Sequence, residues 1–193
     1  MLLLLTFSLC NFTFAQENSY TRSIKAYQKN YVDSHEVVKK KDAKYFHFFP
    51  INNQYNVTCS FEKITDTAGF TMKTSANTLK HYFKYGRLDF NISGTDCHLF
   101  VYQSKDLMQT EKYKNYLFVP FMDLTSGDES YGSGRYLEFF STDIQNNSLL
   151  LDFNKAYNPY CAYSSGYKCP IPPKENNLPV AIKAGEMNFG KAH

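Results

Sequence analysis

Several features that would point directly to a class of protein are missing from this sequence. It has no apolar run of the roughly 20 residues that a membrane-spanning helix needs. It has neither the Gly-Lys-Ser/Thr ending of a phosphate loop nor the Gly-x-Ser-x-Gly of a hydrolase elbow. No two cysteines stand at the two- to four-residue spacing of a zinc site. These absences argue against such sites, whereas a catalytic triad assembled from distant positions stays open.

The composition is that of a single globular domain. The chain has 193 residues, of which 43% are hydrophobic and 20% are charged, and this length suffices to bury a core. The excess of 21 basic over 18 acidic residues comes mostly from a lysine run at 39–44. Because a short run is usually a solvated face and the two signs are interspersed elsewhere, we expect no nucleic-acid partner.

The first residues resemble a signal peptide. An apolar stretch reaches Phe14 and is followed by Ala15 and then by polar residues, which predicts cleavage after Ala15. No Lys or Arg precedes this stretch, in contrast to most signal peptides. Cys10 would be the acceptor of a lipid anchor, but the residues before it fit a lipoprotein signal poorly. We therefore expect an exported protein, periplasmic or extracellular, whose mature chain is residues 16–193.

The periodicity predicts one helix followed by strands. Apolar residues three and four positions apart at Ile24, Tyr27 and Tyr31 predict a helix between residues 17 and 44. Alternation of period two predicts a strand at 55–62 and a hairpin between 87–92 and 97–102. Further strands are expected at 116–124, 135–141, 148–153 and 178–184. Because no helical segments separate them, the fold class is mainly β: an antiparallel β-sandwich or barrel with an N-terminal helix.

Three motifs in the C-terminal half, at 118–138, 151–163 and 169–186, carry a resemblance to a known family. The first ends in Tyr-Gly-Ser-Gly-Arg-Tyr-Leu-Glu, the second reads Leu-Asp-Phe-Asn-Lys-Ala-Tyr-Asn-Pro-Tyr-Cys-Ala-Tyr, and the third begins Cys-Pro-Ile-Pro-Pro. In this order they resemble the bacterial family called domain of unknown function 1684, and a looser likeness extends over most of the mature chain. The lysine run, Cys59 and Cys97 depart from the family pattern. The resemblance implies candidate positions but no reaction.

The four cysteines downstream of the leader allow up to two disulfide bonds. Four cysteines can pair in three ways, and an exported protein meets oxidising conditions. We expect a bond between Cys161 and Cys169, which would close a loop of about nine residues worth about 2.6 kcal/mol. A zinc site would need ligands from distant strands because the five histidines are scattered. We expect no metal and no cofactor.

Candidate site residues cluster around Arg135. The glycine-rich segment 125–135 suits either an anion-binding nest or, more simply, a hairpin loop. The spacing of Asp152, Asn154 and Asn158 does not fit a calcium loop and suggests turn caps. The candidate binding residues are Tyr131, Arg135, Asn154, Asn158, Tyr163 and Asn176.

Two functions stay open. The first is a non-catalytic envelope protein that binds a small ligand, a glycan or a protein partner between the Arg135 loop and residues 154–169. The second is a hydrolase that uses carboxylates as acid and base, with Arg135, Asp152 and Glu186 as the catalytic candidates. A plainer alternative pairs Arg135 with a carboxylate in a buried polar patch. The sequence leaves the oligomeric state open.

Overall fold

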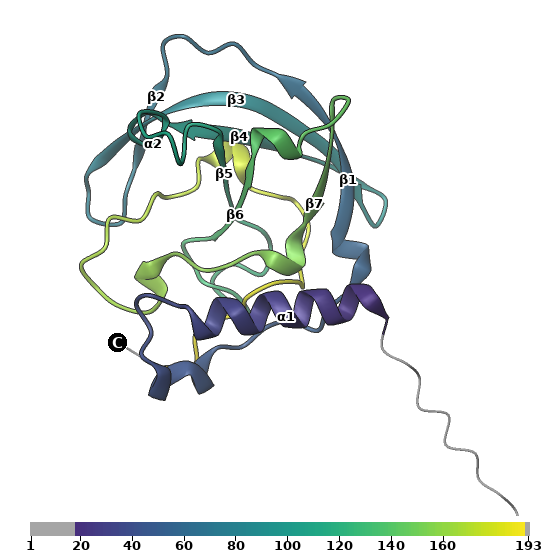
Figure 1. The fold of residues 1–193 in the computed structure, drawn as a ribbon, viewed down its shortest axis with the longest axis vertical. Coiled ribbons are helices and arrows are strands. Elements are labelled where there is room, and N and C mark those ends of the chain that lie inside the picture. Colours follow the sequence, from purple (N-terminus) through teal and green to yellow (C-terminus); the bar gives the residue numbers. More distant parts are fainter. Residues whose placement is uncertain (1–17, 192–193) are drawn as a thin grey trace, which may run out of the picture.

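The structure is a computed structural model that describes residues 18–191. The predicted signal peptide and Cys10 lie outside the described residues. Seven antiparallel strands form a curled, half-barrel sheet, and one long helix, α1 (Ser19–Asp33), crosses its open side (Figure 1). This confirms the mainly β prediction with an N-terminal helix. No helix in the described part of the chain is long and apolar enough to cross a membrane.

The strands run in the order β6-β5-β4-β3-β1-β7, and β2 pairs with the outer part of β3. Their bounds are β1 Asn56–Lys63, β2 Phe70–Lys73, β3 Leu79–Ile92, β4 Thr95–Ser104, β5 Tyr116–Phe121, β6 Arg135–Phe140 and β7 Ser148–Asp152. Short helices connect them: η1 Lys40–Tyr45, η2 Asn53–Tyr55, α2 Lys105–Met108, η3 Ser141–Asp143, η4 Phe153–Lys155, η5 Tyr160–Ala162 and η6 Lys174–Asn176.

The predicted hairpin is β3–β4, the longest pairing in the sheet. Ile92 pairs with Thr95, so the two-residue turn is Ser93-Gly94, and both residues have positive φ. Such a turn matches the twist of the paired strands. A bulge between Lys84 and Gly86 shifts the register of β3, and a Cβ on Gly86 would lie 2.2 Å from the ring of Phe61.

The N-terminal helix is shorter than predicted. Asn18 caps it by accepting a hydrogen bond from the Thr21 amide at 2.7 Å, and the helix ends at Asp33. The chain turns there because the His35 ring accepts the amides of Val37 and Val38 at 3.2 and 2.9 Å. The lysine run therefore forms the separate helix η1 and does not continue α1.

The segment 178–184 was predicted to be a strand, and this prediction is wrong. Its first half makes only two backbone bonds to residues 122–124, from the Leu178 amide to the Met122 carbonyl at 2.8 Å and from the Leu124 amide to the Val180 carbonyl at 3.1 Å. Its second half bonds to buried side chains: the Ile182 amide donates to Asp123 at 2.7 Å. The carbonyls of Ile182 and Ala184 accept from the Arg135 guanidinium. The segment alternates like a strand because one side is buried, but at residues 182–184 the buried pair Arg135–Asp123 takes the place of a neighbouring strand.

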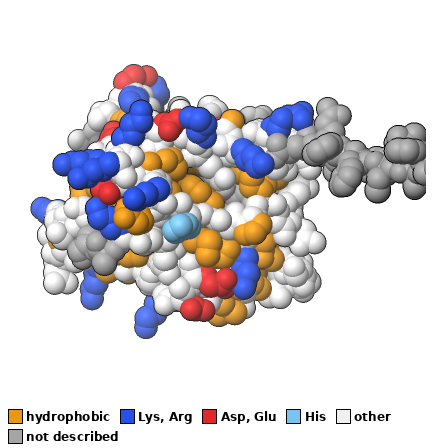
Figure 2. Space-filling model, turned by 90° about the horizontal axis from the view of Figure 1, so that it is seen from below, with side chains coloured by type: hydrophobic (Ala, Val, Ile, Leu, Met, Phe, Trp, Pro, Cys, Tyr) orange, Lys and Arg blue, Asp and Glu red, His pale blue; other side chains and the backbone are white. Residues whose placement is uncertain are grey.

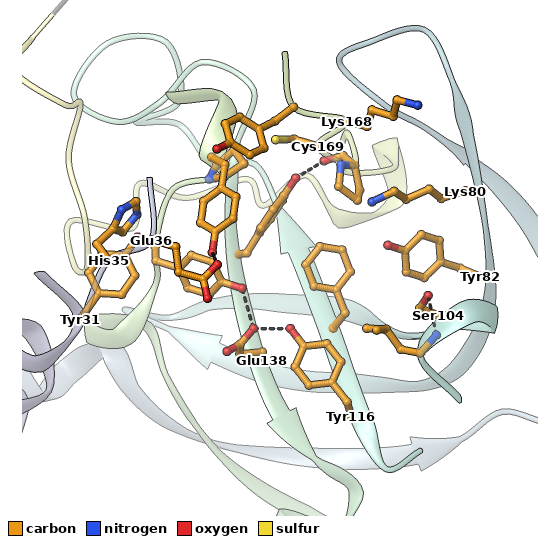
Figure 3. A pocket seen from close by; sticks show the side chains of 18 of the residues that line it. Tyr31, His35, Glu36, Lys80, Tyr82, Ser104, Tyr116, Glu138, Lys168 and Cys169 are labelled. Atoms are coloured by element: carbon orange, nitrogen blue, oxygen red, sulfur yellow. Dashed lines mark hydrogen bonds between the residues drawn. The ribbon is translucent and has the colours of Figure 1, made fainter. Parts of the chain in front are cut away.

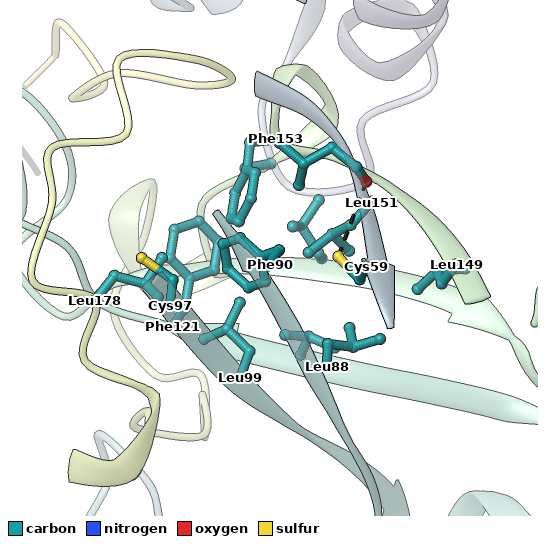
Figure 4. Close-up of a cluster of buried hydrophobic side chains, with 14 of the residues drawn as sticks. Cys59, Leu88, Phe90, Cys97, Leu99, Phe121, Leu149, Leu151, Phe153 and Leu178 are labelled. Atoms are coloured by element: carbon teal, nitrogen blue, oxygen red, sulfur yellow. Dashed lines mark hydrogen bonds between the residues drawn. The ribbon is translucent and has the colours of Figure 1, made fainter. Parts of the chain in front are cut away.

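The two faces of the sheet carry different side chains. One face holds the main core of aliphatic and phenyl groups, including Leu88, Leu99 and Leu151 (Figure 4). Cys59 and Cys97 lie in this core as free thiols, so the possible second disulfide does not form. The other face carries a smaller aromatic cluster of Met72, Tyr82, Tyr102, Phe118 and Tyr136. We call it the aromatic face.

Candidate ligand-binding site

A cavity of about 620 Å³ lies over the aromatic face, within the size range of small-molecule sites (Figure 3). Its floor comes from strands β3 to β6, one side from the end of α1, and the roof from residues 157–170. We call it the tyrosine cavity, because its lining includes Tyr27, Tyr31, Tyr82, Tyr116, Tyr136, Tyr157, Tyr160 and Tyr167. The polar residues of the lining are Ser34, His35, Glu36, Lys80, Ser104, Glu138 and Lys168.

Strand register sets the floor of the tyrosine cavity. Phe118 of β5 pairs with Glu138 of β6, and Tyr102 of β4 pairs with Phe118. Directly opposed side chains point to the same face of an antiparallel sheet, and residues two apart do too. Tyr116 and Tyr136 therefore flank this row on the same face.

Glu138 is the carboxylate at the floor of the tyrosine cavity. Its Oε2 accepts hydrogen bonds from the hydroxyls of Tyr116 and, at 2.6 Å, of Tyr157. Burial, followed by the negative charge of Glu138, raises the pKa of the Tyr116 hydroxyl. Burial is also the largest cause of the raised pKa of Tyr157. Both phenols thus stay protonated and act as donors at any physiological pH.

The roof of the tyrosine cavity is tied down at several points. A disulfide bond joins Cys161 and Cys169, as predicted, with their Cα atoms 6.3 Å apart. The backbone amide and carbonyl of Tyr157 bond to those of Tyr136 at 3.1 and 2.9 Å, and the Tyr136 hydroxyl donates to the Pro170 carbonyl. The segment is therefore fixed over the sheet and is not a free loop.

The end of α1 closes one side of the tyrosine cavity. Tyr31, His35 and Glu36 reach it from this side, and the Tyr160 hydroxyl of the roof donates to Glu36 at 3.0 Å. Burial lowers the pKa of His35, so its ring is neutral at pH 7. The helix and the roof thus meet through polar contacts at the rim.

Arg135, the centre of the predicted site, lies outside the tyrosine cavity. It is fully buried and pairs with Asp123 at 3.1 Å. Its other nitrogen donates to the carbonyls of Ala184 and Glu186, so the guanidinium holds the C-terminal segment against β6. The glycine-rich segment before it is the β5–β6 hairpin loop, with positive φ at Gly127 and Gly134.

Asp152 and Asn154 anchor the start of α1. The Tyr20 hydroxyl donates to Asp152 at 3.0 Å, and the Asn154 side chain bonds to the backbone of Asn52 in both directions at 2.9 Å. Asp152 also caps η4 by accepting the Asn154 amide. The polar atoms of Asp152 and Asn154 are thus taken up by hydrogen bonds that hold the fold together. Neither residue lines the tyrosine cavity.

Glu186 lies behind the cavity wall. Its carboxylate accepts from the Tyr163 hydroxyl at 2.7 and 2.8 Å, from the Asn158 amide at 2.9 Å and from the Tyr31 hydroxyl at 3.3 Å. Burial raises the pKa of Glu186 to about 7, and these hydrogen bonds lower it in part. Glu186 therefore changes charge near neutral pH. It is fully buried, and the carboxylate that pairs with Arg135 is that of Asp123 and not that of Glu186.

The two remaining predicted residues have structural partners. Asn176 bonds to Phe100 and Pro120, so it bridges β4 and β5 where their ladder is short. The Tyr131 hydroxyl donates to the Cys161 carbonyl at 3.2 Å. Of the predicted binding residues, none lines the tyrosine cavity. The three catalytic candidates do not meet in one pocket either.

Sequence reasoning missed most of the residues that line the tyrosine cavity, although the expected wall at 154–169 overlaps its roof. The sequence did contain a signal for two of them. In β6, Tyr136 and Glu138 alternate with Arg135 and Leu137, so they point to the opposite face of the sheet. An alternating strand normally places its second set of residues in solvent, so these residues were not singled out. Within the described residues, no three His, Cys, Asp or Glu side chains gather as a metal site would require.

These features define a class: an antiparallel half-barrel with a tyrosine-lined cavity between its sheet and a disulfide-closed segment. The chain belongs to the family described as protein of unknown function DUF1684, whose model matches residues 42–187. This confirms the resemblance seen in the motifs. No curated protein matches the chain.

A similar solved structure is the NMR structure of the uncharacterized protein from gene locus rrnAC0354 of Haloarcula marismortui. It is 27% identical, with a TM-score of 0.65, and the match covers 87% of this chain and 94% of the other. The similarity extends over nearly the whole fold and brings no activity with it.

Proposed function

We propose that the protein binds a small organic ligand in the tyrosine cavity and has no catalytic role. The observation that carries this proposal is the cavity itself: a volume of about 620 Å³, open to solvent on one side, with aromatic walls and a few polar groups. Tyrosine rings offer flat apolar faces, and their hydroxyls supply hydrogen bonds at the rim. The hydrolase alternative has no support from the cavity. Its two candidate carboxylates, Asp152 and Glu186, both lie outside it.

We further propose that the protein works outside the cytoplasm. The disulfide between Cys161 and Cys169 supports this, since such bonds persist mainly in oxidising compartments. Mass spectrometry of the protein recovered from its native host tests the proposal. A mature N-terminus at Gln16 is expected, and an intact N-terminus in the cytoplasmic fraction would contradict export.

Ligand binding is testable by thermal shift with a panel of oligosaccharides, peptides and small aromatic compounds. A ligand of the tyrosine cavity should raise the melting temperature of the wild type and have less effect on Tyr167→Ala, which removes an exposed ring from the lining. Tyr45→Ala is the matched control, because Tyr45 packs on Phe189 away from the cavity. A panel without any stabilising compound, or equal shifts in the wild type and Tyr167→Ala, would refute the site.

A further inference from the structure

The charged groups of the tyrosine cavity are divided between two sides. Glu36 and Glu138 lie on the side of α1 and β6, and Lys80 and Lys168 lie on the opposite side (Figure 3). On the face of the molecule shown in Figure 2, by contrast, basic side chains are spread among acidic and apolar ones. The cavity therefore has an acidic end and a basic end.

At the acidic end, Glu138 has capacity to accept another hydrogen bond. Both tyrosine hydroxyls donate to Oε2, and no group of the described residues donates to Oε1. The side chain is exposed and has no ion-pair partner among the described residues. An ammonium group placed there would meet a carboxylate oxygen and the surrounding aromatic rings, both of which attract cations.

At the basic end, the two lysines lack carboxylate partners. Within the described residues, neither Lys80 nor Lys168 forms an ion pair, in contrast to lysines such as Lys84 and Lys183. Lys80 is half-buried at the start of β3, and Lys168 is exposed in the roof. A carboxylate that enters the cavity from this side would find two ammonium groups that are free to bind it.

The spacing of the two ends restricts the length of the ligand. Glu138 lies on β6 and Lys80 on β3, which are three steps apart in the sheet order. At about 4.8 Å per step, the two strands are about 14 Å apart across the sheet. Lys80 lies four residues along β3 from Lys84, which is in the same row as Glu138. At about 3.3 Å per residue this adds about 13 Å along the strands, so the two Cα atoms are about 19 Å apart. Both side chains extend from their strands into the cavity, so the gap between their charged groups is shorter than this distance (Figure 3). An extended peptide covers about 3.3 Å per residue, so about four residues bridge the gap.

From these observations we propose that the ligand is a short peptide of about four residues, bound as a zwitterion. Its N-terminal ammonium lies at Glu138, its C-terminal carboxylate lies at Lys80 and Lys168, and its side chains pack on the tyrosine rings. This inference rests on the proposed function. A neutral glycan can hydrogen-bond to these groups through its hydroxyls but supplies no opposite charge to either end, whereas a zwitterion supplies one to each.

Isothermal titration calorimetry with the tetrapeptide Ala-Phe-Phe-Ala tests the proposal. The free peptide should bind, and N-acetylation or C-amidation should each weaken binding at least tenfold. Glu138→Gln should weaken the free peptide at least tenfold without changing the affinity of the acetylated peptide. Lys80→Gln with Lys168→Gln should do the same for the amidated peptide. Glu111→Gln, an exposed carboxylate outside the cavity, should have no effect.

The two proposals fail in different ways. Equal affinity for the free, acetylated and amidated peptides would overturn the zwitterion, and so would binding of maltotetraose that is insensitive to Glu138→Gln. Both results would leave a ligand in the tyrosine cavity. If neither peptides nor sugars bind and no compound of the panel responds to Tyr167→Ala, the proposed function itself fails. Unchanged affinity of the acetylated peptide shows that the Glu138→Gln cavity is intact.

Discussion

Replacing Glu186 with glutamine is expected to remove a pH dependence from the stability of the protein. The carboxylate is fully buried, and its folded-state pKa is about 7 against an ordinary value of 4.5. Glutamine has the same shape as the protonated acid, and the hydroxyls of Tyr31 and Tyr163 can each donate or accept. The variant should therefore keep the hydrogen-bond network in its neutral form.

The sign follows from proton binding. Because folding raises the pKa of Glu186, the folded protein holds this proton more tightly than the unfolded chain does. The stabilisation is complete below the unfolded pKa and is lost as the pH rises through about 7. The full shift corresponds to about 3 kcal/mol, of which about 2 to 3 kcal/mol falls between pH 5 and pH 8.

Urea denaturation at pH 5, 6, 7 and 8 measures this effect as the difference between wild type and Glu186→Gln. His35, whose pKa is lowered by burial, gives stability a slope of the opposite sign, but it is present in both proteins and cancels. The wild type should lose stability relative to the variant as the pH rises. Parallel profiles over this range would refute the reasoning and would mean that Glu186 is ionised throughout.

Three further predictions concern the fold. Arg135→Met leaves a buried carboxylate unpaired and should cost about 3–5 kcal/mol in urea denaturation, whereas an unchanged midpoint would contradict the ion pair. Replacing Cys161 and Cys169 by serine should cost about 2.6 kcal/mol, with calorimetry as the check and reduced wild type as the control. Gly86→Ala places a Cβ 2.7 Å from a β1 carbonyl oxygen and should cost about 1–3 kcal/mol by thermal melting. Gly132→Ala, with only ordinary contacts, should be near neutral.

The parts of the fold that could be predicted depend on local pattern. The β3–β4 hairpin follows from alternation on both sides of Ser93-Gly94, whose positive φ the turn requires. The bond between Cys161 and Cys169 joins residues close in sequence, so a short loop sufficed to expect it. In both cases the residues that decide the structure are neighbours in the chain.

The site could not be predicted because its partners are distant in sequence. Tyr31, Tyr116, Glu138 and Tyr157 come from α1, two strands and the roof, and each looks like an ordinary surface or core residue within its own element. The most polar motif, around Arg135, drew attention instead, although a guanidinium enclosed by carbonyls and Asp123 is occupied by the fold. A charged residue in a motif can thus serve packing, whereas Glu138, on a strand without a motif, lines the cavity. The face of a strand that points away from the core can hold a site where another segment covers it, as residues 157–170 cover the face with Tyr136 and Glu138.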